Sequence, residues 1–114
     1  MTLQQDLKQF TGSERLYITN RFEFMRITDG VKYFADKGGA YWAVTDILAT
    51  AIMLREQFLV AKVVSKDNKA VITYEDGDCN KIQHATQEYG WTDLPEGEYK
   101  FYVIDGVMLL PSEY

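Results

Sequence analysis

The sequence is poor in the residues that catalysis and metal binding use most, with one cysteine and one histidine among 114 residues. A single cysteine, Cys79, excludes an internal disulfide, which is typical of a protein from a reducing cytoplasm. A zinc site would need carboxylates to complete its ligands. The acidic turn at 75–79 (EDGDC) lacks the oxygen spacing of an EF-hand loop. We therefore expect a solvated turn, with no metal and no cofactor.

Signatures of catalysis are also missing. His84 lies five residues after Cys79, but nothing in the pattern forces the two side chains together, and no GxSxG motif accompanies them. Gly38 and Gly39 open a helix, yet no phosphate-binding GxxxxGK[ST] or GxGxxG is present. We interpret both glycines as a corner between helices that needs a positive φ. No catalytic residue is predicted, and the sequence favours a protein that is not an enzyme.

Basic residues are too few for a nucleic-acid binder. Twelve lysines and arginines face 17 acidic residues, giving a net charge of −5 that repels phosphate backbones. The longest apolar segment, 40–54, has only fifteen residues and contains Asp46. A membrane-spanning helix needs about 20 residues, and the N-terminus lacks the pattern of a signal peptide. We expect a soluble, cytoplasmic protein.

What the chain has instead is aromatic residues, at 14% with eight tyrosines. Its length suits one domain, residues 1–114, whose folding would bury roughly two-thirds of the extended-chain surface. No repeat, linker or low-complexity tract divides it. Tyrosine joins an apolar ring to a polar tip, which favours a half-exposed sheet face or a binding surface.

Turn and cap residues divide the chain into helices and strands. In the first half we expect a helix at 2–9, strands at 15–20 and 22–27, a helix that starts at Thr28 or Asp29 and ends at Gly38-Gly39, and an apolar helix over 40–54. In the second half we expect strands at 58–64, 70–74 and 80–87, a loop at 90–97, and a hairpin around Asp105-Gly106. This order predicts an α+β fold, with an N-terminal helix and a two-helix unit on one face of an antiparallel sheet of about five strands.

The apolar helix has two different sides. A broad main face holds Ala40, Tyr41, Val44, Ile47, Leu48, Ala51 and Leu54. Trp42, Ala49 and Met53 lie on the other side together with Asp46. A helix with two apolar sides is covered on both, and a buried carboxylate needs a partner, for which an arginine such as Arg55 could serve.

Asp46 is therefore the residue whose role is hardest to assign. One interpretation is a small polar or cationic pocket, with Trp42 beside Asp46 and with Tyr33, Tyr41, Asp29 and Met53 as further binding candidates. The other is an exposed helix face that carries one solubilising charge. Sequence alone leaves both open.

Several strings resemble a known family: TDGVKYFADKGGAYW, GWTDLPEGEYKFY, DGVMLLPSEY and the N-terminal FTGSE. They are similar to a family of small bacterial proteins of unknown function, often found in genomes rich in plasmids and phages. The resemblance covers nearly the whole chain. It implies a cytosolic bacterial protein and permits a mobile-element setting, but it implies no catalytic or binding residue.

Two hypotheses follow from these observations. The first is a non-enzymatic interaction protein that binds a protein partner or a second copy of itself through an aromatic surface, with a mobile-element modulator of a host defence protein as a subclass. The second is a small enzyme or ligand-binding protein with a pocket around Asp46 and Trp42. A deep pocket at Asp46 would favour the second hypothesis, and a flat apolar patch the first.

Overall fold

The computed structural model describes residues 3–11, 16–18, 25–55, 57–76, 80–82 and 85–114. Its helices are α1 (Leu3–Leu7), α2 (Asp29–Gly38), α3 (Tyr41–Leu54) and the short 3-10 helix η2 (Pro111–Glu113). Its strands are β1 (Leu16–Ile18), β2 (Arg26–Thr28), β3 (Phe58–Lys66), β4 (Lys69–Asp76), β5 (Gln87–Tyr89), β6 (Gly97–Ile104) and β7 (Val107–Leu109). The fold is α+β, as predicted.

All the described strands belong to one seven-stranded sheet in the order β1-β2-β7-β6-β3-β4-β5. The predicted sheet of about five antiparallel strands is therefore too small. The two short N-terminal strands extend it beyond β7, and β2 runs parallel to β7 with Arg26 opposite Val107. The other neighbouring strands pair antiparallel.

The predicted hairpin at Asp105-Gly106 is confirmed, and β3 and β4 form a second hairpin whose turn residues also have positive φ. Asp67 and Asn68 join β3 to β4 with φ of 54° and 59°, and Asp105 and Gly106 join β6 to β7 with φ of 50° and 82°. Two-residue loops of this kind match the twist of the flanking strands, and Asn, Asp and Gly adopt them at low cost.

The predicted strand at 80–87 is largely wrong. The described strand in this region, β5, starts at Gln87 and pairs with β4, and Lys81 makes only an isolated bridge to Glu75. Residues 83 and 84 lie outside the described part of the chain. The side chains of Gln87 and Tyr89 have hydrogen-bond partners on α3 and β4, which hold the strand in place at 87–89.

Helix α2 begins and ends as its sequence predicts. Thr28 is the N-cap, and its hydroxyl accepts a hydrogen bond from the Val31 amide at 3.4 Å. Gly39 ends the helix in a left-handed conformation, with φ of 60°. Gly38 is still helical, so the prediction of a positive φ holds for Gly39 alone. A Cβ at Gly38 would lie 2.9 Å from Leu94 Cδ1, which makes close packing the reason for that glycine.

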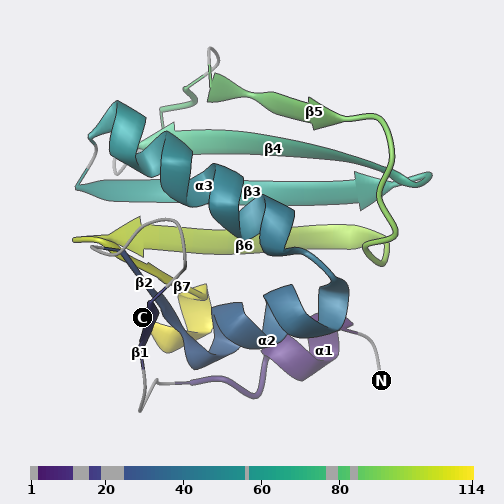
Figure 1. Cartoon of the computed structure of the whole chain (residues 1–114), viewed down its shortest axis with the longest axis horizontal. Helices are drawn as coiled ribbons and strands as arrows, with labels where there is room; N and C mark the ends of the chain where they lie inside the picture. Colours follow the sequence, from purple (N-terminus) through teal and green to yellow (C-terminus); the bar gives the residue numbers. More distant parts are fainter. Residues whose placement is uncertain (1–2, 12–15, 19–24, 56, 77–79, 83–84) are drawn as a thin grey trace.

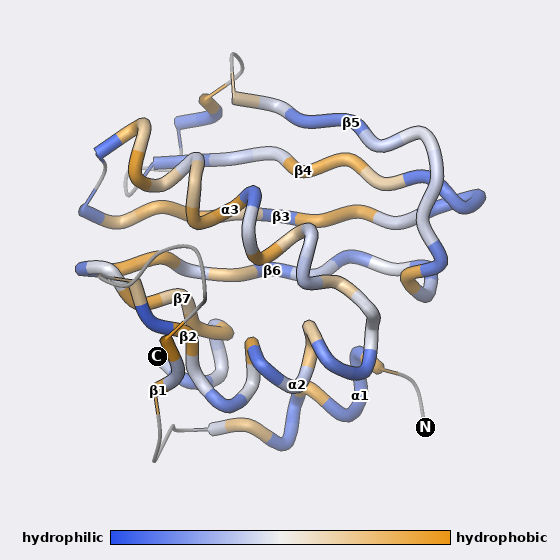
Figure 2. Tube along the Cα trace, viewed as in Figure 1, coloured by the Kyte–Doolittle hydropathy of each residue, from blue (hydrophilic) through white to orange (hydrophobic). Residues whose placement is uncertain are grey.

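Helices α2 and α3 cover one face of the sheet, and the core lies between these two layers (Figure 1). The rings of Phe34 and Phe101 lie 4.8 Å apart there, and both side chains are fully buried. Helix α2 alternates between polar and apolar residues, whereas α3 is apolar along most of its length (Figure 2). Tyr41, expected on the main apolar face of α3, is 48% exposed instead.

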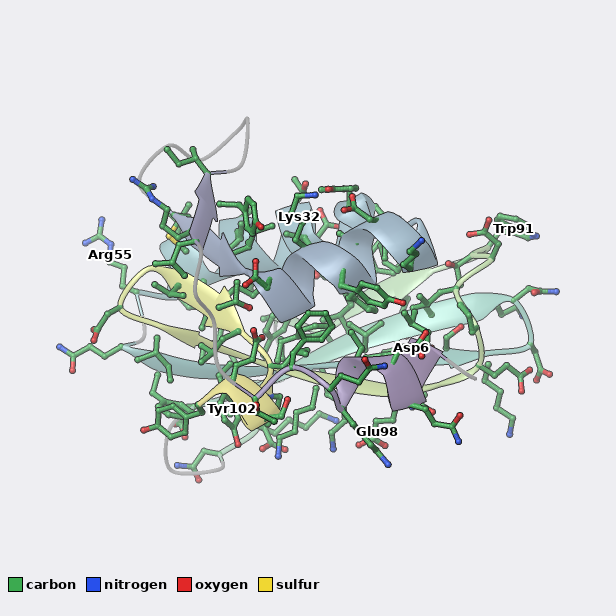
Figure 3. All side chains as sticks on the ribbon, turned by 90° about the horizontal axis from the view of Figure 1, so that it is seen from below. Asp6, Lys32, Arg55, Trp91, Glu98 and Tyr102 are labelled. Atoms are coloured by element: carbon green, nitrogen blue, oxygen red, sulfur yellow. The ribbon has the colours of Figure 1, made fainter. Side chains whose placement is uncertain are left out.

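Neither α2 nor α3 lies on the opposite face of the sheet. Figure 3 shows the labelled side chains of Glu98 and Tyr102 on this side, with α2 and α3 on the other. We call this surface the open face. None of the described helices is long and apolar enough to span a lipid bilayer.

Candidate functional site

The second side of α3 is covered by the edge strand β5. The hydroxyl of Tyr89 donates a hydrogen bond to the Asp46 carboxylate, and the Tyr89 ring lies 4.5 Å from that of Trp42, tilted by 56°. Tyr89 follows Asp46 by 43 residues in the chain, so only the folded sheet brings them together. The space beside Asp46 and Trp42, where a ligand was considered, is occupied by this tyrosine.

A chain of hydrogen bonds continues from Asp46 into the sheet. The Thr50 hydroxyl donates to the Asp46 carbonyl at 2.8 Å and accepts from the Gln87 amide at 3.2 Å. The amide oxygen of Gln87 in turn accepts from the Tyr74 hydroxyl at 2.8 Å. These contacts fasten α3 to β4 and β5. No buried side-chain nitrogen or oxygen of the described residues lacks a hydrogen-bond partner, so this network is satisfied without a ligand.

The pKa values of both tyrosines in this network, Tyr74 and Tyr89, are raised. Burial raises the pKa of Tyr74 to about 12; the Thr50 hydroxyl opposes this effect, and the charge of Asp46 adds to it. Burial also raises the pKa of Tyr89, and the hydrogen bond to Asp46 raises it further. At neutral pH both hydroxyls are therefore hydrogen-bond donors, which suits them to hold structure together rather than to abstract a proton.

The other binding candidates lie elsewhere. Tyr33 donates a hydrogen bond to Asp6 at 3.1 Å and packs on Phe10, and its pKa is raised, chiefly by burial and then by Asp6. Tyr33 and Asp29 line a cavity of about 270 Å³ between α2 and the segment after α1. Tyr41 donates to Asp36, and Met53 is 66% exposed. The structure therefore links Asp46 and Trp42 through Tyr89 but does not bring the six candidates into one pocket.

Two of the alternatives that the sequence raised cannot be placed. Cys79 and His84 lie outside the described residues, and so does the centre of the acidic turn, 77–79. Within the described part of the chain, no three side chains of His, Cys, Asp or Glu gather as a metal site.

The open face has one apolar half, which follows from the register of its strands. Cross-strand partners share a face, so one row runs through Phe58, Ile104 and Val107. The next row contains Val60, Tyr102 and Leu109. We call these six residues together with Tyr114 the aromatic half of the open face.

Three rings form the centre of the aromatic half. Phe58 lies 5.1 Å from Tyr102, and Tyr114 packs edge-on against both, at 5.9 Å and 5.6 Å. Tyr114 remains 76% exposed. Each ring thus contacts the other two on the face opposite α2 and α3, which makes this the largest grouping of aromatic side chains outside the core in the described structure.

Charged side chains lie next to the aromatic half on the open face, and Val64 and Val71 lie beyond them. The Lys62 ammonium lies 3.4 Å from the Glu98 carboxylate, and the Lys100 ammonium lies 5.9 Å from the centre of the Tyr102 ring. Thr73 sits beside Lys62 in register. The charged side chains thus border the aromatic half on one side, as a polar rim borders an apolar centre in many protein interfaces.

Sequence reasoning missed this surface, although its signal is present. A sheet strand with one solvated face alternates apolar and polar residues, but FLVAKV and YKFYVI are apolar at both kinds of position. Leu59 and Phe101 already supply the buried residues of these strand positions, so the neighbouring Phe58 and Tyr102 are apolar residues that the core does not need. These additional apolar residues are the sequence signal of the aromatic half.

Two of the strings used for the family resemblance meet in space. The Glu113 carboxylate accepts hydrogen bonds from the Thr28 hydroxyl at 2.7 Å, the Gly30 amide at 3.1 Å and the Leu110 amide at 3.0 Å. A carboxylate at a helix N-terminus also complements the helix dipole. The TDG and PSE segments therefore fasten the end of the chain to the start of α2, which is a structural role.

Comparison with known proteins gives a family and no activity. No curated protein and no solved structure matches the chain. One family model covers residues 1–114, and its description states only that the function of the family is unknown. The chain thus belongs to the family of unknown function DUF6876.

Proposed function

We propose that this protein is a non-enzymatic interaction module that binds a protein partner through the aromatic half of its open face. The observation that carries the proposal is the cluster of Phe58, Tyr102 and Tyr114, three mutually contacting rings on the face opposite α2 and α3. Aromatic residues are enriched at protein interfaces, because rigid rings bury much area at little entropic cost.

The surroundings of the rings support this assignment. Val60 and Leu109, the cross-strand neighbours of Tyr102, are buried and give the cluster an apolar floor. Lys62, Glu98 and Lys100 supply charges at its border. The resemblance to proteins of plasmid- and phage-rich genomes makes a modulator or inhibitor of a host defence protein the subclass that we propose.

The alternative, a ligand pocket around Asp46 and Trp42, is less well supported. Tyr89 packs on Trp42 and bonds Asp46, so a ligand would have to displace this side chain and break the contact between β5 and α3. The cavities lined by Asp29 and Tyr33, and by Glu98 and Lys100, include neither Asp46 nor Trp42.

Photo-crosslinking tests the proposal. Benzoylphenylalanine replaces Tyr114 in one variant and Trp91 in a control, because both side chains are strongly exposed, at 76% and 71%. Trp91 lies far from Tyr102, which packs against Tyr114 (Figure 3). We expect one discrete adduct from position 114 in a lysate of the native host, and none from position 91. Equal labelling from both positions, or none from position 114, would contradict the proposal.

A second copy of the chain is the other occupant to distinguish. If the partner is another copy, position 114 gives a crosslinked dimer from the purified protein alone. Light scattering on the purified protein then shows a dimer at high concentration. A strict monomer by light scattering would remove self-association and leave a different protein as the partner.

A further inference from the structure

The edge of β6 is paired over only part of its length. β7 pairs with Tyr102 to Ile104, whereas β6 begins at Gly97. Helix α1 lies farther along the same edge (Figure 1), where the Gln4 side-chain amide donates a hydrogen bond to the Glu98 carbonyl at 2.7 Å. Between the end of β7 and Gln4, the strand edge at Lys100 has no neighbouring strand.

The backbone of Lys100 points into this gap. The two residues that flank a two-residue hairpin turn, here Ile104 and Val107, form a backbone hydrogen-bonded pair. From Ile104 backwards, the backbone N–H and C=O groups of every second residue of β6 therefore point toward the edge that β7 occupies. Lys100 therefore directs its N–H and C=O groups to the same side as Glu98, whose carbonyl meets Gln4 there. No described residue donates to or accepts from these two groups of Lys100.

Pro111 explains why β7 stops short of Lys100. With Leu109 opposite Tyr102, continued antiparallel pairing would place residue 111 opposite Lys100. Proline has no N–H to donate to the Lys100 carbonyl, and at Pro111 the chain turns into η2 instead. Because of Pro111, the position next to Lys100 on this edge of the sheet is not filled by β7.

A cavity of about 370 Å³ occupies this position, within the size range of small-ligand pockets. We call it the β6 notch. Leu7, Leu110 and Pro111 form its apolar lining. Lys8 and Lys100 also line it, and Glu98, the acidic residue beside them, lies 3.4 Å from Lys62.

We propose that the β6 notch binds an extended peptide segment of a partner protein that carries a carboxylate, and that this segment adds a short strand to β6. The backbone N–H and C=O of Lys100 would pair with one residue of the peptide, as in β-strand addition. Lys8 and Lys100 would attract its carboxylate, and the leucines would receive an apolar neighbour. This inference does not rest on binding at the aromatic half.

Selection from a displayed library of random heptapeptides against the purified protein tests the proposal. We expect enrichment of peptides that contain Asp or Glu beside apolar residues. On addition of an enriched peptide, the backbone amide of Lys100 should shift in a ¹⁵N-resolved NMR spectrum. Failure to enrich any peptide, or enriched peptides that leave the Lys100 amide unmoved, would overturn the proposal.

Two variants of one residue separate the backbone contact from the charge. Lys100→Gln removes the charge and keeps the N–H, whereas Lys100→Pro also removes the N–H, which points away from β3 and so is not needed for the β3–β6 ladder. We expect Lys100→Gln to weaken peptide binding by a few-fold and Lys100→Pro by about tenfold or more. Lys69→Gln, in the β3–β4 hairpin, is the matched control and should bind like the unaltered protein.

A peptide that binds Lys100→Pro as tightly as the unaltered protein would contradict the inference. Circular dichroism verifies that the variant is folded; if it is not, the NMR shift of Lys100 in the unaltered protein decides. Lys8→Gln changes a residue that lines the β6 notch but does not belong to the aromatic half, so crosslinking from position 114 should be unchanged in this variant. The two proposals can thus fail separately.

Discussion

The two faces of the sheet differ in how completely their side chains and backbone groups are covered. On the covered face, Phe34, Phe101 and Tyr74 are fully buried, and the polar groups near them have partners. On the open face, three rings remain partly exposed, and at its edge Lys100 has no strand on the side away from β3. The covered face therefore accounts for stability, and groups that could take an external partner lie on the other side.

The largest expected effect compares two neighbours on β6. Phe101 packs on Phe34 in the core, whereas Tyr102 points to the open face. We expect Phe101→Ala to lower the free energy of unfolding by about 3–5 kcal/mol, and Tyr102→Ala by about 1 kcal/mol, through its lost ring contacts. Urea denaturation measures both; equal losses would refute the division between the faces.

The next effect concerns the bond between Glu113 and the start of α2. Glu113→Ala would leave the Thr28 hydroxyl and the amides of Gly30 and Leu110 without their acceptor. Loss of hydrogen bonds to a charged group should cost about 2–3 kcal/mol. Glu98→Ala is the control, because it removes a largely exposed ion pair and should cost less than about 1 kcal/mol. Thermal unfolding that ranks the two variants in reverse would contradict this role.

Alkaline pH should weaken the covered face specifically. The pKa of Tyr74 is about 12 in the folded protein against 10 in a free tyrosine. Above pH 10 the unfolded chain loses this proton while the folded chain keeps it, so stability falls as pH rises from 10 to 12. A shift of this size corresponds to roughly 2–3 kcal/mol. Tyr74→Phe should flatten the fall in denaturation experiments; an unchanged slope would contradict the burial argument.

We expect the smallest change in the free energy of unfolding at Asp46, the residue that stood out most in the sequence. Asp46→Asn keeps an acceptor for Tyr89, so we expect a loss of about 0.5–1 kcal/mol, and a similar loss for Tyr89→Phe. Because both changes affect one hydrogen bond, the double variant should lose less than the sum. Additive losses in a double-mutant cycle would show that the pair does not interact.

Local chemistry explains how much of the fold could be predicted. The hairpin at Asp105-Gly106 and the ends of α2 at Thr28 and Gly39 depend on turn and cap residues, which act over a few positions. The parallel pairing of β2 with β7 joins segments about 80 residues apart, and no short pattern encodes it. The strand at 87–89 depends equally on contacts with α3.

The candidate sites differ in the same way. The amphipathic pattern of α3 indicated that its second side is covered, but not that Tyr89 covers it. Phe58 and Tyr102 were readable as surplus apolar positions, yet only the register places them beside Tyr114. The β6 notch depends on Pro111 falling opposite Lys100, which requires the pairing of β6 with β7 to be known.

The most direct test of the account asks which surface the partner needs. Crosslinking from position 114 should be measured in two backgrounds, Tyr102→Lys on the open face and Asp46→Asn on the covered side. The account predicts that Tyr102→Lys abolishes the adduct while Asp46→Asn leaves it unchanged, with both variants folded by circular dichroism. An adduct that survives Tyr102→Lys and disappears in Asp46→Asn would contradict the account and assign partner binding to the Asp46–Trp42 site.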